Sequence, residues 1–249
     1  MSGHSKWAQI KRKKAVTDAR RGQLWTKILK EITVAARLGS GDPASNPRLR
    51  SAIDEAKANN VPNDNIDRAV QRGTGELEGM QYEEAVFEGY APGGVAVLVE
   101  TVTDNRNRTV SEMRHIFSRH GGSLAAAGAV AWQFERRGEI VLDRAAVDEE
   151  RLVELALELG VEDLSTDGEA YELYTPADAF HAVLERLEAH GLAPLSRQLA
   201  MNPKAQVEPE ADAANQALRL LDALEEHDDV QHVWANLEID EEAMASERA

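Results

Sequence analysis

The stretch that decides the fold is residues 85–103, AVFEGYAPGGVAVLVETVT. Two runs of β-branched or alternating apolar residues flank the turn-forming Ala91-Pro92-Gly93-Gly94. This pattern predicts a β-hairpin with strands at Ala85–Tyr90 and Val95–Thr103.

A helix is expected after the hairpin. Thr109 and Glu112 have the spacing of a capping box, and an apolar face follows as far as Gly121-Gly122. The next apolar run, Val130–Phe134, predicts a strand. Together these elements form most of an α/β sandwich that still lacks one helix and one strand.

The missing pieces are expected near the C-terminus, as a helix at 213–226 and a strand at 230–239. The residues between have their own order of elements, βαββαβ, which matches the ferredoxin-like unit. Its strands are expected at 139–142, 161–165, 170–174 and 192–201, and its helices at 149–159 and 176–189. We therefore predict that residues 136–204 are inserted into an α+β domain made of 76–135 and 205–240, with a polar tail at 241–249.

Before the hairpin the apolar period is helical, and residues 23–75 predict a three-helix domain. The first helix is expected to end at Leu38, with Gly39 as its left-handed cap. Asn46 and Pro47 suit the start of the second helix. Pro62 is expected to open the third, and Gly73 to close it. The fold class predicted for the whole chain is α+β, with an N-terminal helical domain and two α/β sandwich domains.

Charge is divided unevenly along the chain. Residues 1–75 hold 15 Lys and Arg against 7 Asp and Glu, a net charge of +8, and the rest holds 13 against 37, a net charge of −24. Residues 1–22 have few large apolar side chains, so they predict a basic arm that needs a partner to become ordered. An acidic body follows this arm.

Clustered cations of this kind can neutralise phosphates and release counterions, which gives affinity for nucleic acid that does not depend on base sequence. Trp7 lies among them, where its indole either stacks on an unpaired base or packs between helices. The candidate nucleic-acid-binding residues of the arm and first helix are Lys6, Trp7, Lys11, Arg12, Lys13, Lys14, Arg20, Arg21, Lys27 and Lys30.

A second candidate binding segment is Thr103–Thr109, where turn-forming residues and two arginines precede a helix N-terminus. Backbone N–H groups and the helix dipole favour a phosphate there, and Arg106 and Arg108 could hold it. The alternative is that Asp104 and Asn105 form a turn and both arginines pair with the acidic surface.

Several classes of protein are excluded or disfavoured. The chain has no Cys, which removes disulfides, thiolate nucleophiles and cysteine-ligated zinc and fits a cytoplasmic location. No apolar run approaches the roughly 20 residues of a membrane-spanning helix. No nucleotide-binding or hydrolase motif occurs, and we predict neither an enzyme, a metal nor a cofactor. His227, Asp228, Asp229 and His232 resemble metal ligands by composition alone.

Several motifs, spread over nearly the whole chain in order, resemble the YebC/PmpR family. They are Gly3-His4-Ser5-Lys6-Trp7, the run from Asp42-Pro43 to Asn46-Pro47-Arg48-Leu49-Arg50, Asp64-Asn65-Ile66, Gly73-Thr74-Gly75, Thr103–Thr109, and Phe117 with Gly121-Gly122-Ser123-Leu124. The resemblance implies a helical N-terminal domain followed by two α+β domains. It also implies a role in gene expression, since some members are described as DNA-binding transcriptional regulators and others as ribosome-associated factors that relieve stalls at proline-rich sequences.

The function predicted from the sequence is therefore a non-enzymatic regulator of gene expression that binds nucleic acid, with DNA as the first target. The alternative is a translation factor on the ribosome that binds ribosomal RNA or tRNA. In either case a protein partner could bind the acidic α/β domains. A metal-dependent hydrolase that uses the C-terminal carboxylates with His227 or His232 is a distant alternative.

Overall fold

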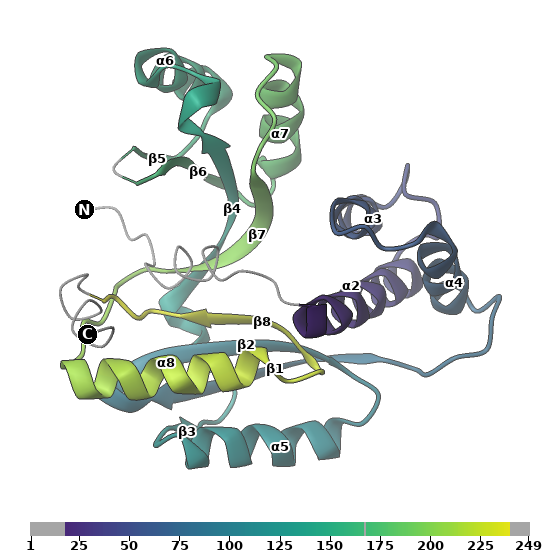
Figure 1. The fold of residues 1–249 in the computed structure, drawn as a ribbon, viewed down its shortest axis with the longest axis vertical. Helices are drawn as coiled ribbons and strands as arrows, with labels where there is room; N and C mark the ends of the chain where they lie inside the picture. The colour runs from purple at the N-terminus through teal and green to yellow at the C-terminus, as the bar shows by residue number, and fades with distance from the viewer. Residues whose placement is uncertain (1–17, 167, 240–249) are drawn as a thin grey trace. The chain divides into compact units, whose positions relative to one another are not determined.

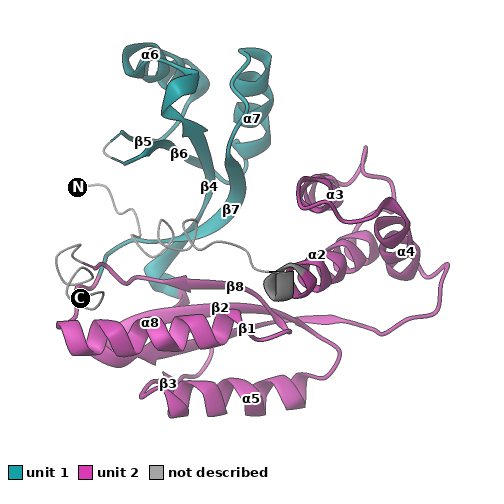
Figure 2. Cartoon of the chain, in the orientation of Figure 1, with its two compact units in different colours: residues 1–6, 132–206 teal, residues 7–131, 207–249 magenta. Residues whose placement is uncertain are grey.

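The computed structural model describes residues 18–166 and 168–239 of the chain, without the side chains of residues 18–21. The described chain forms two compact units (Figure 2). One unit consists of residues 132–206, and the other contains the residues before and after this segment. The first unit is therefore an insertion in the second.

The first described segment of the larger unit is helical. Helix α2 spans Asp18–Leu38, α3 spans Pro47–Ala58 and α4 spans Asn63–Thr74. Apolar residues from all three helices, among them Ile32, Leu49 and Ile66, form one buried cluster. The predicted three-helix arrangement is confirmed, although α2 begins five residues before the expected Gln23.

Caps explain where α3 begins and ends. The Asn46 side chain accepts a hydrogen bond from the Leu49 N–H, and Pro47 follows at the first helical position, as predicted. The Asn46 amide also donates to the carbonyls of Ala35 and Ser40, at 2.9 and 2.8 Å, which ties the end of α2 to the start of α3. The helix ends at Asn59, and Asn60 takes a positive φ of 57°.

Two glycine predictions were wrong. Gly39 is absent from the residues with positive φ, so it is no left-handed cap. Gly73 lies inside α4, where an added Cβ would stand 2.4 Å from the Thr33 carbonyl oxygen, and the helix ends instead at Gly75 with φ 85°. Gly73 is therefore required by the close approach of α4 to α2, a role that its place in the sequence does not reveal.

The second part of this unit is a four-stranded sheet in the order β3-β1-β2-β8. Its antiparallel strands are β1 (Glu83–Ala91), β2 (Val95–Thr103), β3 (Ser123–Leu124) and β8 (Val230–Ala235). Helices α5 (Arg106–Arg119) and α8 (Ala211–Glu225) pack on one face of the sheet (Figure 1). The hairpin register, from Glu83 opposite Thr103 to Ala91 opposite Val95, confirms the predicted β-hairpin.

Two details of this sheet correct the prediction. The strand expected at Val130–Phe134 is absent, and the short β3 pairs with β1 in its place. The expected capping box also does not form, because α5 is capped by Asn105 and the hydroxyl of Thr109 is buried in other contacts.

A buried carboxylate orders the loop that leads out of this sheet. Glu88, on β1, accepts hydrogen bonds from the backbone N–H groups of Gly128, Val130 and Ala131 at 2.6 to 2.8 Å. Burial raises the pKa of Glu88, but these three bonds outweigh burial and leave the pKa below its ordinary value. The ionised Glu88 therefore holds the loop on the sheet.

The inserted unit has the predicted order βαββαβ. Its strands are β4 (Phe134–Asp143), β5 (Asp163–Ser165), β6 (Ala170–Pro176) and β7 (Ser196–Pro203), and its helices are α6 (Glu149–Leu159) and α7 (Phe180–Ala189). The sheet order β5-β6-β4-β7, with all neighbours antiparallel, is that of the ferredoxin-like fold. The predicted α+β fold class is confirmed.

Candidate nucleic-acid interface

The structure describes only some of the predicted binding residues. Lys6, Trp7, Lys11, Arg12, Lys13 and Lys14 lie outside the described residues. Arg20 and Arg21 belong to α2, but their side chains are outside the description as well. The remaining four predicted residues, Lys27, Lys30, Arg106 and Arg108, can be placed.

Lys30 is a buried cation. Its ammonium lies 2.9 Å from Asp229 Oδ1 and also donates to the Asp228 carbonyl at 2.9 Å. The side chains of Lys30 and Asp229 are only 11% and 4% exposed. Lys30 therefore joins α2 to the turn between α8 and β8, and its charge is neutralised inside the protein.

Arg108 approaches the same carboxylate from α5. Its Nη2 lies 2.8 Å from Asp229 Oδ2 and 2.8 Å from Asp104 Oδ1. The Thr109 hydroxyl adds a hydrogen bond of 2.9 Å to Asp229 Oδ2. Burial raises the pKa of Asp229, but the hydrogen bonds from Lys30, Arg108 and Thr109 outweigh burial and hold the pKa well below its usual range.

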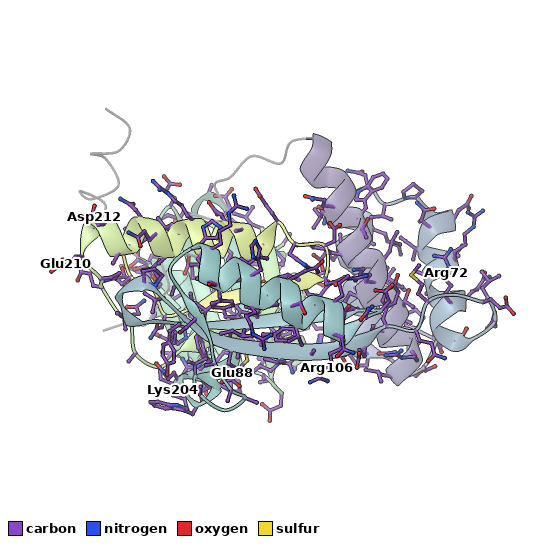
Figure 3. The ribbon with its side chains drawn as sticks, turned by 90° about the horizontal axis from the view of Figure 1, so that it is seen from below. Arg72, Glu88, Arg106, Lys204, Glu210 and Asp212 are labelled. Carbon is purple, nitrogen blue, oxygen red and sulfur yellow. The ribbon has the colours of Figure 1, made fainter. Side chains whose placement is uncertain are left out.

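Asp229 thus lies beside the segment Thr103–Thr109 that was expected to hold a phosphate, and the side chains of Thr103, Arg108 and Thr109 bind its carboxylate. Asn105 caps the helix, and Arg108 pairs with acidic groups, as the alternative interpretation predicted. Arg106 is more available, because its side chain is 58% exposed and its nearest carboxylate, that of Glu83, is 4.0 Å away. Arg106 lies at the start of α5 (Figure 3).

A cleft of about 510 Å³ opens beside Asp229. Two cations, Lys30 and Arg108, line it together with five carboxylates, those of Asp104, Glu112, Glu226, Asp228 and Asp229. Lys27, nearby on α2, donates to the Glu225 carbonyl at 2.5 Å. The excess of negative charge makes this cleft a poor site for a phosphate.

Three possible metal ligands meet in the same cleft. Donor atoms of Glu112, His227 and Asp229 lie within 4.8 Å of one another. His227 Nε2 is 2.8 Å from Glu112 Oε2, and its Nδ1 accepts the Asp229 N–H at 3.1 Å. Both ring nitrogens are thus engaged, and Asp229 already pairs with two cations, so the arrangement favours a hydrogen-bonded network over a cation site. His232 stacks on Trp234 instead.

A second, smaller pocket of about 210 Å³ lies between α2 and α4. Three cations line it, Lys30, Arg68 and Arg72, together with Asn65 and Tyr82, and none of the described residues that line it is a carboxylate. Arg68 and Arg72 are not among the binding residues predicted from the sequence. Their spacing of four residues beside Asn65, on the polar side of an amphipathic helix, was the available signal.

The helical part presents further free cations. Five are exposed, and none has an ion pair or a side-chain hydrogen bond to another described residue: Arg37, Arg50, Lys57, Arg68 and Arg72. By contrast, Arg48 is held by Glu31 and Glu84, each at 2.6 Å. Residues 22–75 hold 8 Lys and Arg against 6 Asp and Glu, so most of the net charge of +8 predicted for residues 1–75 belongs to residues 1–21.

Comparison with known proteins finds two family models that match successive segments of the chain. The N-terminal domain of the TACO1/YebC protein matches residues 5–76, and the second and third domain of TACO1/YebC match residues 82–237. The chain belongs to the TACO1/YebC family. The resemblance to YebC seen in the sequence motifs is therefore confirmed.

Relatives within the family are similar over their full length. A probable transcriptional regulatory protein of Chlorobium luteolum is 53% identical over 99% of both chains, and one of Acidithiobacillus ferrooxidans is 54% identical over 98% of both. The crystal structure of a conserved hypothetical protein from Aquifex aeolicus superposes with a TM-score of 0.87 at 50% identity, covering 95% of this chain and 98% of that one.

None of the helices that the structure describes is long and apolar enough to cross a membrane.

Proposed function

We propose that this protein is a cytoplasmic, non-enzymatic regulator of gene expression that binds the backbone of nucleic acid through its basic arm and its helical domain. The observation that carries the proposal is the charge separation, with a net charge of +8 in residues 1–75 and −24 in the rest. Family relatives named as probable transcriptional regulatory proteins support the same class of function.

In this proposal the arm and the helical domain have related tasks. Lys6, Lys11, Arg12, Lys13, Lys14, Arg20 and Arg21 neutralise phosphates, and Trp7 stacks on a base or wedges into a groove. The exposed arginines of the described helices extend this basic surface. Lys30 and Arg108 have another task, since both are bound to Asp229: Lys30 holds α2 to the sheet, and Arg108 fixes the carboxylate from α5.

Salt dependence tests the proposal. If roughly six phosphates are neutralised, affinity for duplex DNA should fall about a thousandfold between about 50 and 200 mM salt. The variant K13E/K14E should lose most of the affinity and part of the salt dependence. A matched control is R114E/R119E, which makes the same change of charge on exposed positions of α5. Equal losses in the two variants, or a flat salt response, would refute the assignment of binding to the arm.

A translation factor bound to ribosomal RNA or tRNA is the second candidate. It is favoured by the strongly acidic remainder of the chain, which reduces indiscriminate binding and can meet a protein partner. It needs no code for base edges, whereas a promoter-specific regulator must place side chains in a groove. Crosslinking in cells, with sequencing of both DNA and RNA, separates the two: ribosomal RNA peaks indicate translation, and promoter peaks indicate transcription.

A further inference from the structure

We propose that the pocket between α2 and α4 binds a single nucleotide of an unpaired nucleic-acid strand, with the phosphate held by Arg68 and Arg72 and the base against Tyr82. The inference rests on the proposed function and deepens it, because it names a contact site in the described part of the chain. No residue of this pocket except Lys30 was expected to bind nucleic acid.

The charge of the pocket between α2 and α4 favours a bound anion. The chain has a net charge of −16, and five carboxylates line the cleft beside Asp229. The pocket between α2 and α4 is lined by three cations and by no carboxylate of the described part of the chain. Two of these, Arg68 and Arg72, have no ion-pair partner among the described residues, so their charges are available to a bound anion.

The polar side chains of the pocket are aligned along α4. Asn65, Arg68 and Arg72 are spaced by three and four residues, so they form one stripe along α4. The Asn65 amide lines the same pocket and adds a donor to the two guanidinium groups. Planar guanidinium groups match phosphate oxygens in pairs, which gives such a site direction as well as charge.

The position of Arg72 is restricted by the chain that follows the helix. A Cβ added to Gly79 would lie 3.2 Å from both Cγ and Cδ of Arg72, so the aliphatic part of that side chain packs directly over the glycine. Figure 3 shows Arg72 on this part of the molecule. Packing of its stem reduces the freedom that Arg72 would otherwise lose on binding a phosphate.

Tyr82 argues for an unpaired strand. Its ring forms a wall of the pocket, and the Lys30 ammonium lies 5.7 Å from the ring centre. Aromatic side chains stack on bases that are free of a partner, whatever their sequence. A pocket of about 210 Å³ is smaller than the sites that enclose drug-sized ligands, so it has no room for a duplex and holds one nucleotide only in part.

Fluorescence anisotropy with labelled strands of about 12 nucleotides tests the proposal, a length within the site sizes of single-strand binders. The probes are oligo-uridine RNA, oligo-thymidine DNA, an abasic strand of the same length, and a duplex. The full-length variant R68A/R72A should bind both single strands at least tenfold more weakly, because two charge-assisted contacts are lost. Its salt slope should decrease by about 0.7 for each phosphate no longer neutralised.

Three further variants make the test specific. R114A/R119A removes the same charge from exposed positions of α5 and should change affinity no more than about threefold, as expected for a long-range effect. R68K/R72K keeps the charge and should still bind more weakly than the native chain, because lysine lacks the planar fork. Y82L should weaken binding of the RNA and DNA strands and leave the abasic strand unchanged.

The outcomes separate this pocket from the proposed function. If the native chain binds the probes and R68A/R72A loses no more affinity than R114A/R119A, the proposal that the pocket binds a nucleotide is overturned and the proposed function stands. If duplex affinity falls as much as single-strand affinity, the assignment to an unpaired strand is overturned. If the native chain binds none of the probes, both proposals fail. Unequal losses on RNA and DNA identify which strand the pocket takes.

Discussion

Replacing Asp229 with asparagine removes one negative charge and keeps the shape of the side chain. In the native protein the carboxylate contacts the Lys30 ammonium, the Arg108 guanidinium and the Thr109 hydroxyl, all at 2.8 to 2.9 Å. Asparagine cannot neutralise either cation. The substitution therefore tests whether this carboxylate holds the helical part to the sheet.

The unfolding free energy lost in D229N should come mainly from the unpaired charge of Lys30. Its side chain is 11% exposed, and a buried charge left without its partner costs about 3–5 kcal/mol of unfolding free energy. Arg108 is 43% exposed, so solvent screens it and its pairing adds at most about 1 kcal/mol. For a unit of this size we expect the melting temperature to fall by roughly 10 °C.

The effect should depend on pH in a defined direction. Because the pKa of Asp229 is lower in the folded protein than in the unfolded chain, the carboxylate stabilises the fold fully above the unfolded value of about 4. This contribution is lost as the pH falls toward the folded value. The native protein and D229N should therefore differ most near neutral pH and converge under acidic conditions.

Thermal and urea unfolding of the full chain measure these differences, with D228N as the control. Asp228 is exposed and contacts Lys30 only through its backbone carbonyl, so D228N should stay within about 0.5 kcal/mol of the native protein. A D229N variant that unfolds within about 1 kcal/mol of the native protein, at every pH, would show that the buried pair does not hold the two parts together.

Three other substitutions have expected outcomes of their own. E88Q should lower the unfolding free energy by about 1–3 kcal/mol at neutral pH and by less in acid, because the pKa of Glu88 is lowered in the folded protein; hydrogen exchange at Gly128 should report the freed loop. G73A should lower the melting temperature, because the added Cβ clashes where α4 packs on α2. The control G22A, whose added Cβ meets no atom within 4 Å, should raise the unfolding free energy by up to about 1 kcal/mol. An unchanged melting temperature for G73A would contradict the close packing. N46A removes the helix cap and the two hydrogen bonds from the Asn46 amide, so it should lower the unfolding free energy by about 2 kcal/mol, measured by urea unfolding. A loss smaller than that expected for an exposed helix cap would contradict the role of this hydrogen-bond network.

The elements with clear periodicity or caps could be predicted from the sequence. Asn46 and Pro47 mark the start of α3, and the residues from Glu83 to Thr103 specify their hairpin through alternation and the turn. Strand β3 has only two residues, Ser123 and Leu124, so it has no period to detect. In β4 the charged run between Phe134 and Glu139 interrupts the apolar pattern, which made one continuous strand resemble two.

The site was harder to predict, because its groups come from distant parts of the chain. Thr103 and Asp229 are hydrogen-bonded across 126 positions, and Lys30 and Asp229 across 199. Local composition predicted an anion at Thr103–Thr109, namely a phosphate bound from outside. It could not indicate that the anion is a side chain of the protein, because only the fold brings Asp229 there.

Pairing between the first and last strands of the inserted unit has a consequence for folding. Phe134 lies opposite Pro203, and the Lys204 N–H donates to the Gln133 carbonyl at 2.8 Å, so the insertion leaves and returns one strand spacing apart. Once folded, the ferredoxin-like unit holds the two ends of the host chain only a few ångströms apart, as a tight hairpin turn would. Folding of the inserted unit already brings its two ends together, so the host sheet does not lose the entropy of closing a long loop. The host sheet can therefore assemble as if β3 and α8 were neighbours in sequence.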